Sequence, residues 1–282
     1  MAVPITLLSP AKLNLFLHIT GQRPDGYHSL QTLFQLLDYG DELTFEANNS
    51  GVCQLTTPLA GVDNNNNLII KAAQALKEAT HCTLGANISI DKRLPMGGGV
   101  GGGSSNAATT LLALNHLWQT KLTLDELANI GLHLGADVPV FVYGQTAWAE
   151  GIGDVLTPVS LVEQWFIVIK PDCHVCTASI FSNEQLTRDT DAITVAAFLD
   201  QGGHNDCETV VSKLYPAVAK TLVWLRQHVD SAALTGTGAC VFARFETKAE
   251  AEKVASHIPY NWDYFIAKGI DRIAGFEQLS QR

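Results

Sequence analysis

The chain has 282 residues, of which 46% are hydrophobic and 16% are charged. This composition can fill a sizeable core and excludes an intrinsically disordered chain. The formal net charge is −10. A chain this acidic lacks the positive surface that binds nucleic acid or an anionic membrane, so we expect neither partner. A small anionic ligand remains compatible, because loop amides and helix ends bind phosphate without net positive charge.

The N-terminal segment, residues 1–19, is apolar but has no basic leading region, and Pro4, Pro10 and Lys12 interrupt it. This pattern favours strands over a signal peptide, and no apolar run reaches the ~18 residues of a membrane span. The six cysteines are scattered, which is typical of reduced thiols in the cytoplasm. Cys173 and Cys176 form a lone C-x-x-C pair without a second ligand pair, so we expect no metal or redox site there.

The N-terminal third is predicted to be rich in strands. From Leu13 to Ile19, apolar residues occupy every second position, which is the period of a β-strand. Residues 21–27 (GQRPDGY) are typical of a turn-rich loop. After the polar run at residues 63–67 (DNNNN), the apolar spacing from Leu68 onward becomes helical. Further strands are predicted at residues 5–8, 33–37, 42–47, 52–56 and 86–91.

A glycine-rich segment, MGGGVGGGSSN at residues 96–106, follows the last of these strands and precedes a predicted helix over residues 104–118. Glycines remove the Cβ atoms that would block close approach and allow successive N–H groups to converge. The helix N-terminus adds unpaired N–H groups and the positive end of a dipole. Ser104 and Ser105 add hydroxyls and can cap the helix. We therefore predict a phosphate-binding loop.

The loop differs from two other glycine motifs that bind phosphate. No Gly-Lys-Ser/Thr ends it, so it is not a Walker A motif. The spacing G-x-G-x-x-G occurs formally at Gly97, Gly99 and Gly102, with Asp125 at a plausible distance for a ribose contact. Asp125, however, lies inside a capping box that begins at Thr123, whereas a dinucleotide site needs its acid at the end of a strand. A flexible linker would not lead directly into an amphipathic helix.

The rest of the chain mixes helices and strands with few strict β-α-β alternations, which favours an α+β fold. We predict two domains, residues 1–156 and 157–282, with the last strand packing back on the first domain. The predicted helices are the one opened by the Thr123 capping box and those at residues 210–228 and 248–257. Strands are predicted at residues 165–171 and 264–267, and residues 232–245 are predicted to form a glycine turn followed by an apolar strand. The segments 138–143 and 146–149 are expected to be buried.

Three segments, in order, closely resemble the motifs of the GHMP kinases, which are small-molecule kinases of the galactokinase, homoserine and mevalonate type. They are PAKLNLFL from Pro10, the glycine loop from Pro95, and LTGTGACVF from Leu234. The segments DGYH at residues 25–28 and GADVPVF at residues 135–141 narrow the resemblance to members that phosphorylate an alcohol carried on a cytidyl diphosphate. The similarity spans nearly the whole chain. It implies a two-lobed fold with the active-site cleft between the lobes, and ATP and Mg²⁺ as cofactors.

The resemblance also implies catalytic roles for Lys12 and Asp137. Lys12 would be a cation at the reacting phosphate, and Asp137 would be the base that accepts the proton of the attacking hydroxyl, in a reaction that depends mainly on positioning and charge stabilisation. The plainer alternatives are a solvated polar face for Lys12 and Asn14, and an N-cap for Asp137. Phe16 and His18 share the face of Lys12, so we expect that face to be covered.

The remaining site residues are also implied by the resemblance. Asn67 is predicted to contact the nucleotide or, equally, to cap the helix that begins at Leu68. No protein metal cage is expected, because the nucleotide would hold Mg²⁺. Two other hypotheses stay open, a GHMP kinase for a different alcohol and a non-catalytic nucleotide sensor, and we expect a monomer or weak homodimer. The predicted ATP-binding residues are Asn67, Pro95, Met96, Gly97, Gly98, Gly99, Val100, Gly101, Gly102, Gly103, Ser104 and Ser105. The predicted substrate-binding residues are Asn14, Tyr27, His28 and Thr177, with residues 235–238 as a loop that closes the site.

Overall fold

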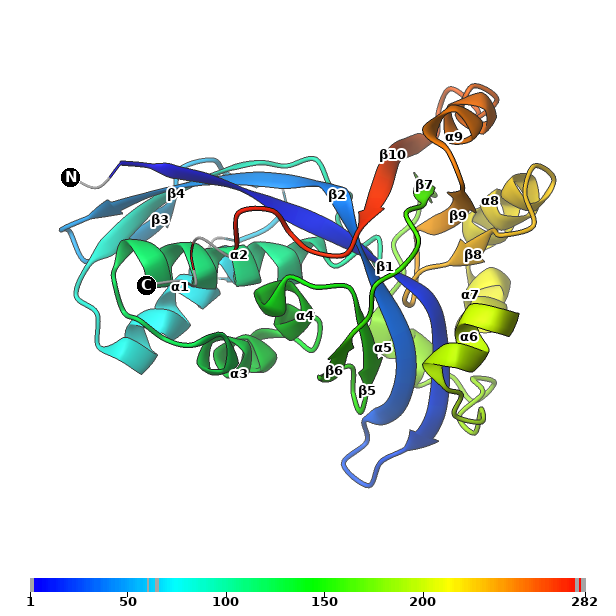
Figure 1. Ribbon diagram of the computed structural model, residues 1–282, viewed down its shortest axis with the longest axis horizontal. Helices are drawn as coiled ribbons and strands as arrows, with labels where there is room; N and C mark the ends of the chain where they lie inside the picture. Colours follow the sequence, from blue (N-terminus) through cyan, green and yellow to red (C-terminus); the bar gives the residue numbers. More distant parts are fainter. Residues whose placement is uncertain (1–2, 60, 64–65, 277–278, 280–282) are drawn as a thin grey trace.

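Two long antiparallel strands, β1 (Ile5–Gln22) and β2 (His28–Asn48), cross the whole molecule in the computed structural model, which describes residues 3–59, 61–63, 66–276 and 279 (Figure 1). The sequence predicted each of them as two shorter strands. Pro10 and Gly40 look like strand ends, but they face each other at a register shift inside the pairing. A Cβ on Gly40 would lie 2.1 Å from the Ser9 carbonyl oxygen, so only glycine lets the strands pair closely here.

One mixed sheet runs through both halves of the molecule, and β10, in the middle of its strand order, connects the two parts. β10 pairs with β7 over most of its length and with β2 at Gly269 and Ile270. The strand order is β3 (Cys53–Leu55), β4 (Gly85–Asp91), β2, β10 (Asp263–Ile270), β7 (Trp165–Lys170), β9 (Val241–Phe245) and β8 (Ala233–Leu234). Off this path, β1 pairs with β2, and β5 (Ala147–Glu150) pairs with β2 and with β6 (Val155–Pro158). The α+β prediction is thereby confirmed.

Four helices lie together beside the N-terminal strands (Figure 1). They are α1 (Leu68–Thr80), α2 (Gly102–Leu117), α3 (Leu124–Leu134) and α4 (Val138–Tyr143). α2 buries every side chain from Ser105 to Asn115, because it lies between the sheet and its neighbouring helices. The predicted capping box is present, since Thr123 accepts a hydrogen bond from the Glu126 N–H and Glu126 accepts one from the Thr123 N–H. Asn64 and Asn65 of the predicted polar run lie outside the described residues.

The C-terminal half contains more helices than the sequence predicted. They are α5 (Thr177–Phe181), α6 (Val195–Gln201), α7 (Glu208–Leu214), α8 (Pro216–Arg226) and α9 (Lys248–Ala255). The helix predicted over residues 210–228 was wrong as one element, because Pro216 begins a new helix. Proline lacks an N–H group and disfavours helical backbone at the residue before it, and Tyr215 has φ −124° and ψ 86°.

A cluster of large apolar side chains joins the two halves. Phe16 of β1 packs against Trp148 and Phe198, with ring centroids 5.0 and 4.7 Å away. Phe166 and Phe242 belong to the same buried cluster. Lys12 and Asn14 are themselves buried, so their face is covered as expected. The domain boundary at residues 156 and 157 stays a prediction. None of the described helices combines the length and apolar character needed to cross a membrane.

Candidate active site

A cavity of about 940 Å³ opens where the glycine loop, the first residues of β2 and helix α5 meet. Its wall contains almost all the residues predicted for catalysis and binding. They are Lys12, Asn14, Tyr27, His28, Asn67, Pro95, Met96, Gly97, Gly98, Gly99, Val100, Gly101, Gly102, Gly103, Ser104, Asp137 and Thr177. Ser105 does not line the cavity. It is fully buried, and its hydroxyl accepts a hydrogen bond from the Ser9 hydroxyl at 2.8 Å.

Lys12 and Asp137 form an ion pair at the wall of this cavity. Lys12 Nζ lies 3.1 Å from Asp137 Oδ2, donates a hydrogen bond to Asn14 Oδ1 at 2.6 Å, and lies 5.0 Å from the centroid of the Phe34 ring. The Lys12 side chain is 4% exposed and that of Asp137 is 34% exposed. A buried ammonium is tolerated because a carboxylate, an amide oxygen and a ring face surround it. The pair therefore presents fixed charge and a reachable carboxylate to a ligand in the cavity.

Asp137 occupies the N-cap position of α4, which was the plainer alternative for this residue. Its side chain nevertheless makes no capping hydrogen bond. Pro139, within the first turn, has no N–H group to satisfy and a fixed φ that suits a helix start. Because proline assists the helix start, the Asp137 carboxylate remains available to Lys12.

Asn14 is held on both sides. Its amide Nδ2 donates to Thr32 Oγ1 at 3.0 Å, its backbone N–H donates to Thr235 Oγ1 at 2.9 Å, and its Oδ1 accepts from Lys12. These contacts connect β1 with β2 and with the turn at residues 235–238. Asn14 therefore fixes the Lys12 ammonium relative to both walls of the cavity.

The glycine loop connects β4 with α2, and the start of α2 differs from the sequence prediction. Gly101, with φ 75°, is the N-cap, and no side chain caps the helix. Ser104 and Ser105, which the sequence offered as possible caps, do not cap the helix, because it already begins at Gly102. An uncapped first turn leaves backbone N–H groups without intrahelical partners. Such groups, at the positive end of a helix dipole, have the chemistry to bind an anion.

The turn at residues 235–238 packs directly on the glycine loop. The Cys240 N–H donates to the Gly98 carbonyl at 3.0 Å. Gly99 has φ 76°, and a Cβ there would lie 2.8 Å from the carbonyl oxygens of Thr235 and Gly238. Across the turn, the hydroxyls of Thr237 and Thr177 are 2.9 Å apart. The two glycine motifs therefore form one surface, and its contact requires glycine at residue 99.

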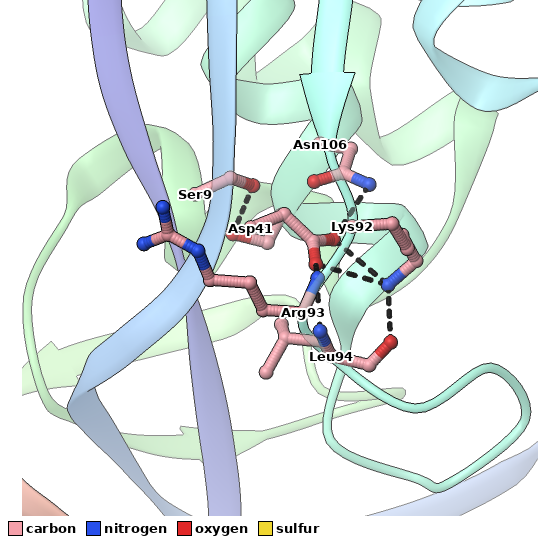
Figure 2. A network of polar contacts seen from close by, with 7 residues as sticks. Ser9, Asp41, Lys92, Arg93, Leu94 and Asn106 are labelled. Carbon is pink, nitrogen blue, oxygen red and sulfur yellow. Dashed lines mark hydrogen bonds and ion pairs between the residues drawn. The ribbon is translucent and has the colours of Figure 1, made fainter. Parts of the chain in front are cut away.

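A buried carboxylate behind the loop, Asp41, was missed by the sequence analysis (Figure 2). Its oxygens accept hydrogen bonds from Lys92 Nζ at 2.9 and 3.1 Å, from the backbone N–H groups of Arg93 and Leu94 at 2.8 and 2.7 Å, and from Asn106 Nδ2 at 3.0 Å. Asp41 thus ties the segment that enters the loop to helix α2. Lys92 and Asn106 also line the cavity. Little in the sequence distinguishes it, because β2 also contains Asp38, Glu42 and Glu46, and only Asp41 among these acids is buried.

Asn67 caps its helix, as one of the two predicted alternatives stated, and the contact with a nucleotide stays a prediction. Its Oδ1 accepts from the Ile69 N–H at 2.9 Å and caps α1, and its side chain also lines the cavity. Its buried Nδ2 has no hydrogen-bond partner among the described residues, and neither has the buried Oδ1 of Asn106. Buried polar groups without partners are rare in folded proteins. These two groups fit a ligand, such as a nucleotide, that carries both acceptors and donors.

Aromatic side chains form the other end of the cavity. Tyr27 is 63% exposed, whereas His28 is buried and stacks on Phe181 with ring centroids 5.2 Å apart. Arg188 Nε donates to His28 Nε2 at 3.0 Å. Burial, and secondly the Arg188 charge, lower the pKa of His28 below its ordinary value. Neither Phe181 nor Arg188 was predicted from the sequence, although Phe181 is only four residues after Thr177.

Cys173 and Cys176 lie near the cavity without forming a ligand set. The described residues hold no group of three or more His, Cys, Asp or Glu side chains that could bind a metal ion. Burial raises the pKa of the Cys173 thiol, which keeps that thiol protonated. All six cysteines are free.

Comparison with known proteins places these features in a family. The GHMP kinases N terminal domain matches residues 67–145, and the GHMP kinases C terminal domain matches residues 183–263. The 4-diphosphocytidyl-2-C-methyl-D-erythritol kinase of Ectopseudomonas mendocina (strain ymp) is 57% identical over 94% of this chain and 91% of its own length. The protein of the same name from Marinobacter nauticus is 54% identical over 100% of this chain and 99% of its own length.

Solved structures show the same similarity. A crystal structure of 4-(cytidine 5'-diphospho)-2C-methyl-D-erythritol kinase superposes with a TM-score of 0.82 and 30% identity, and the match covers 94% of this chain and 99% of that chain. The mevalonate kinase of Methanococcus jannaschii, at 15% identity and a TM-score of 0.69 over 96% of this chain and 99% of that one, shares the fold.

Proposed function

The chain belongs to the GHMP kinases and, within them, to the 4-diphosphocytidyl-2-C-methyl-D-erythritol kinases, and from this premise we propose its substrate and its site residues. The proposed reaction transfers the γ-phosphate of ATP to the 2-hydroxyl of 4-diphosphocytidyl-2-C-methyl-D-erythritol. The products are the 2-phosphate and ADP, in the non-mevalonate pathway to isoprenoid precursors. The observation that carries the proposal is the Lys12–Asp137 pair, 3.1 Å apart, in one cavity with an uncapped helix end and an aromatic pocket.

The phosphates of ATP are proposed to lie on the glycine loop. The backbone N–H groups at the start of α2 would donate to phosphate oxygens, and Lys92 would add positive charge from the same wall. The nucleoside would satisfy the unpaired Asn67 Nδ2. The Ser104 hydroxyl in the cavity wall is a hard oxygen ligand that suits Mg²⁺, which would be held mainly by the nucleotide and would neutralise phosphate charge.

Asp137 is proposed to accept the proton of the attacking hydroxyl. Its partial exposure lets a substrate hydroxyl reach the carboxylate, and the Lys12 ammonium lies directly beside that carboxylate. The same ammonium would offset charge on the phosphoryl group during transfer, which is mainly a matter of positioning and electrostatics. Asn14 is proposed to hold Lys12 in place and to contact the substrate.

The cytosine is proposed to bind at the aromatic end, between Tyr27 and the Phe181–His28 stack, with Thr177 at the edge. Aromatic rings provide stacking surface for a flat base, and the polar edge of His28 provides a hydrogen bond. The enzyme is proposed to work in the cytoplasm as a monomer or weak homodimer. Its free cysteines are consistent with a reducing compartment.

An assay of ADP formation with MgATP and a panel of alcohols tests this function. We expect turnover with the cytidyl substrate and none with homoserine, mevalonate or galactose. Tyr27→Ala should raise KM for the cytidyl substrate and leave KM for ATP unchanged. Equal turnover of an alcohol that lacks cytosine, unaffected by Tyr27→Ala, would instead support a different GHMP kinase. Failure to form ADP in a single turnover with any alcohol would favour the nucleotide sensor.

A further inference from the structure

Building on the proposed cytidyl substrate, we propose that Arg188 makes the site selective for cytosine over uracil by fixing which ring nitrogen of His28 carries the proton. Arg188 does not itself line the cavity, whereas His28 does. Arg188 is therefore a positioning residue that acts through His28.

The hydrogen bond between the two side chains determines the tautomer. Arg188 Nε lies 3.0 Å from His28 Nε2. A guanidinium group has five N–H donors and no acceptor, so His28 Nε2 must accept and carries no proton. A neutral imidazole has one N–H group, and in His28 that group is therefore at Nδ1.

The guanidinium cannot turn away, because backbone carbonyls hold its other nitrogens. Nη1 donates to the Leu186 carbonyl at 3.1 Å, and Nη2 donates to those of Phe181 and Asn183 at 3.0 and 2.8 Å. These carbonyls belong to the segment that carries Phe181, on which the His28 ring stacks. The donor and the ring therefore keep their relative orientation.

The ring also stays neutral at physiological pH. Its burial, and secondly the positive charge of Arg188, lower the pKa of His28, so a second proton at Nε2 is disfavoured. With Nε2 engaged by Arg188, Nδ1 makes no hydrogen bond among the described residues. Because His28 lines the cavity, this one N–H group is the donor that the ring would offer to a base at the aromatic end.

A fixed donor distinguishes the two pyrimidine bases at N3. Cytosine has an unprotonated N3 that accepts a hydrogen bond, whereas uracil has an N3–H group that would face the His28 N–H group. Two opposed donors leave both groups without partners in a buried site, a mismatch expected to weaken binding about tenfold to a hundredfold. The opposite tautomer would accept from uracil and reverse the preference. The discrimination therefore depends on Arg188.

Two measurements test this inference. Long-range ¹H–¹⁵N correlation spectra of the histidine-labelled protein, with His28 assigned from a His28→Asn variant, report which nitrogen is protonated. Calorimetric titrations with CDP and UDP, with a non-hydrolysable ATP analogue occupying the nucleotide site, report selectivity. We expect a protonated Nδ1, an unprotonated Nε2, and CDP bound about tenfold to a hundredfold more tightly than UDP.

Variants connect the tautomer with the selectivity. Arg188→Gln, whose amide can accept as well as donate, should lose most of the CDP preference, whereas Arg188→Lys, which can only donate, should keep it. Arg226→Gln is the matched control, because Arg226 also donates to a backbone carbonyl, that of Ala232, but outside the cavity. It should behave like the parent protein.

The outcomes separate this inference from the proposed function. A proton on Nε2 of His28, or a folded Arg188→Gln protein with an unchanged CDP-to-UDP ratio, would overturn the role of Arg188 while turnover of the cytidyl substrate continued. If Arg188→Gln does not fold, the spectrum of the parent protein decides alone. A parent protein that neither binds CDP nor phosphorylates the cytidyl alcohol would overturn the proposed function, and this inference with it.

Discussion

At the scale of single residues, the site depends on buried polar groups whose partners come from distant parts of the chain. Lys12 meets Asp137, Asn14 meets Thr32 and Thr235, and Asp41 meets Asn106. Each of these groups would be costly to bury alone. Their mutual contacts keep charge and hydrogen-bond donors fixed before any ligand binds, which is the arrangement that electrostatic catalysis requires.

Asp41→Asn is expected to damage the nucleotide end of the site. The amide NH₂ would face one of the donors that the carboxylate accepts, and Lys92 would lose its counter-charge. We predict a loss of ~1–3 kcal/mol in the free energy of unfolding and a higher KM for ATP, with KM for the alcohol substrate little changed. Steady-state kinetics and urea denaturation measure both effects.

Asp91→Asn is the matched control, because Asp91 is 61% exposed and pairs with the neighbouring Arg93 on the surface. Such pairs contribute ~0–1 kcal/mol. If Asp41→Asn changed the free energy of unfolding and KM for ATP no more than Asp91→Asn does, Asp41 would not anchor the loop.

His18 is expected to make stability depend on pH. Its ring is buried, and its Nδ1 has no partner among the described residues. Burial first, and then the nearby His204, lower its pKa, although Asp206 raises it. Below pH ~6.5, His18 binds a proton in the unfolded chain but stays unprotonated in the folded protein. The free energy of unfolding should therefore fall as pH drops from 6.5 towards the folded-state pKa, by no more than ~1.4 kcal/mol per pH unit.

Urea denaturation across this pH range measures the effect, and His18→Gln should make the pH slope shallower, leaving the contribution of His28, whose pKa is also lowered. His133→Gln is the control, because His133 is on the surface and bonds, among the described residues, to the Asn129 carbonyl alone. The same pH slope in the His18→Gln protein as in the parent protein would contradict the assignment.

At the scale of elements, the two glycine motifs act as one unit. Gly99→Ala should separate the loop from the turn, because the added Cβ would lie 2.8 Å from two carbonyl oxygens at a φ that suits glycine. We predict a loss of ~1–3 kcal/mol in the free energy of unfolding together with weaker ATP binding, measured by denaturation and calorimetry. Gly21→Ala, where nothing lies within 4 Å of the added Cβ, should change neither quantity. Normal ATP affinity in Gly99→Ala would refute the required contact.

The sequence predicted the glycine loop, the capping box and most strands, because these depend on local residue types. It did not predict the full length of β1 and β2, since Pro10 and Gly40 resemble strand ends until they are seen opposite each other. It placed one helix where Pro216 separates two. Asp41 could not be found, because the side chains and N–H groups that it binds, from Lys92 to Asn106, are distant in the sequence. Arg188 could not be found, because its ring partner His28 is 160 residues away. Lys12 and Asp137 were associated only through the family resemblance, since they are far apart in the chain.

At the scale of the whole molecule, β10 makes one sheet of two halves. It pairs with β7 in the C-terminal half and reaches β2 at Gly269 and Ile270, while the Phe16 cluster connects the halves on one face. The cavity lies at this junction, with Lys12 from one half and Thr177 from the other. We therefore expect the halves to unfold together.

Differential scanning calorimetry should show a single unfolding transition, which ADP shifts to higher temperature as one peak because binding stabilises the folded state. Two separate transitions, of which ADP shifts only one, would show that the halves fold independently and would favour the predicted boundary at residues 156 and 157 as a physical division.

The central claim is that Asp137, paired with Lys12, is the base of a kinase that acts on the cytidyl alcohol. Asp137→Asn keeps the size of the side chain and removes its basicity. The most direct test measures turnover of the cytidyl substrate and ATP affinity in this variant. We predict that kcat falls by about 10²–10⁴ while calorimetric ATP binding is retained. Turnover equal to that of the parent protein would contradict the account.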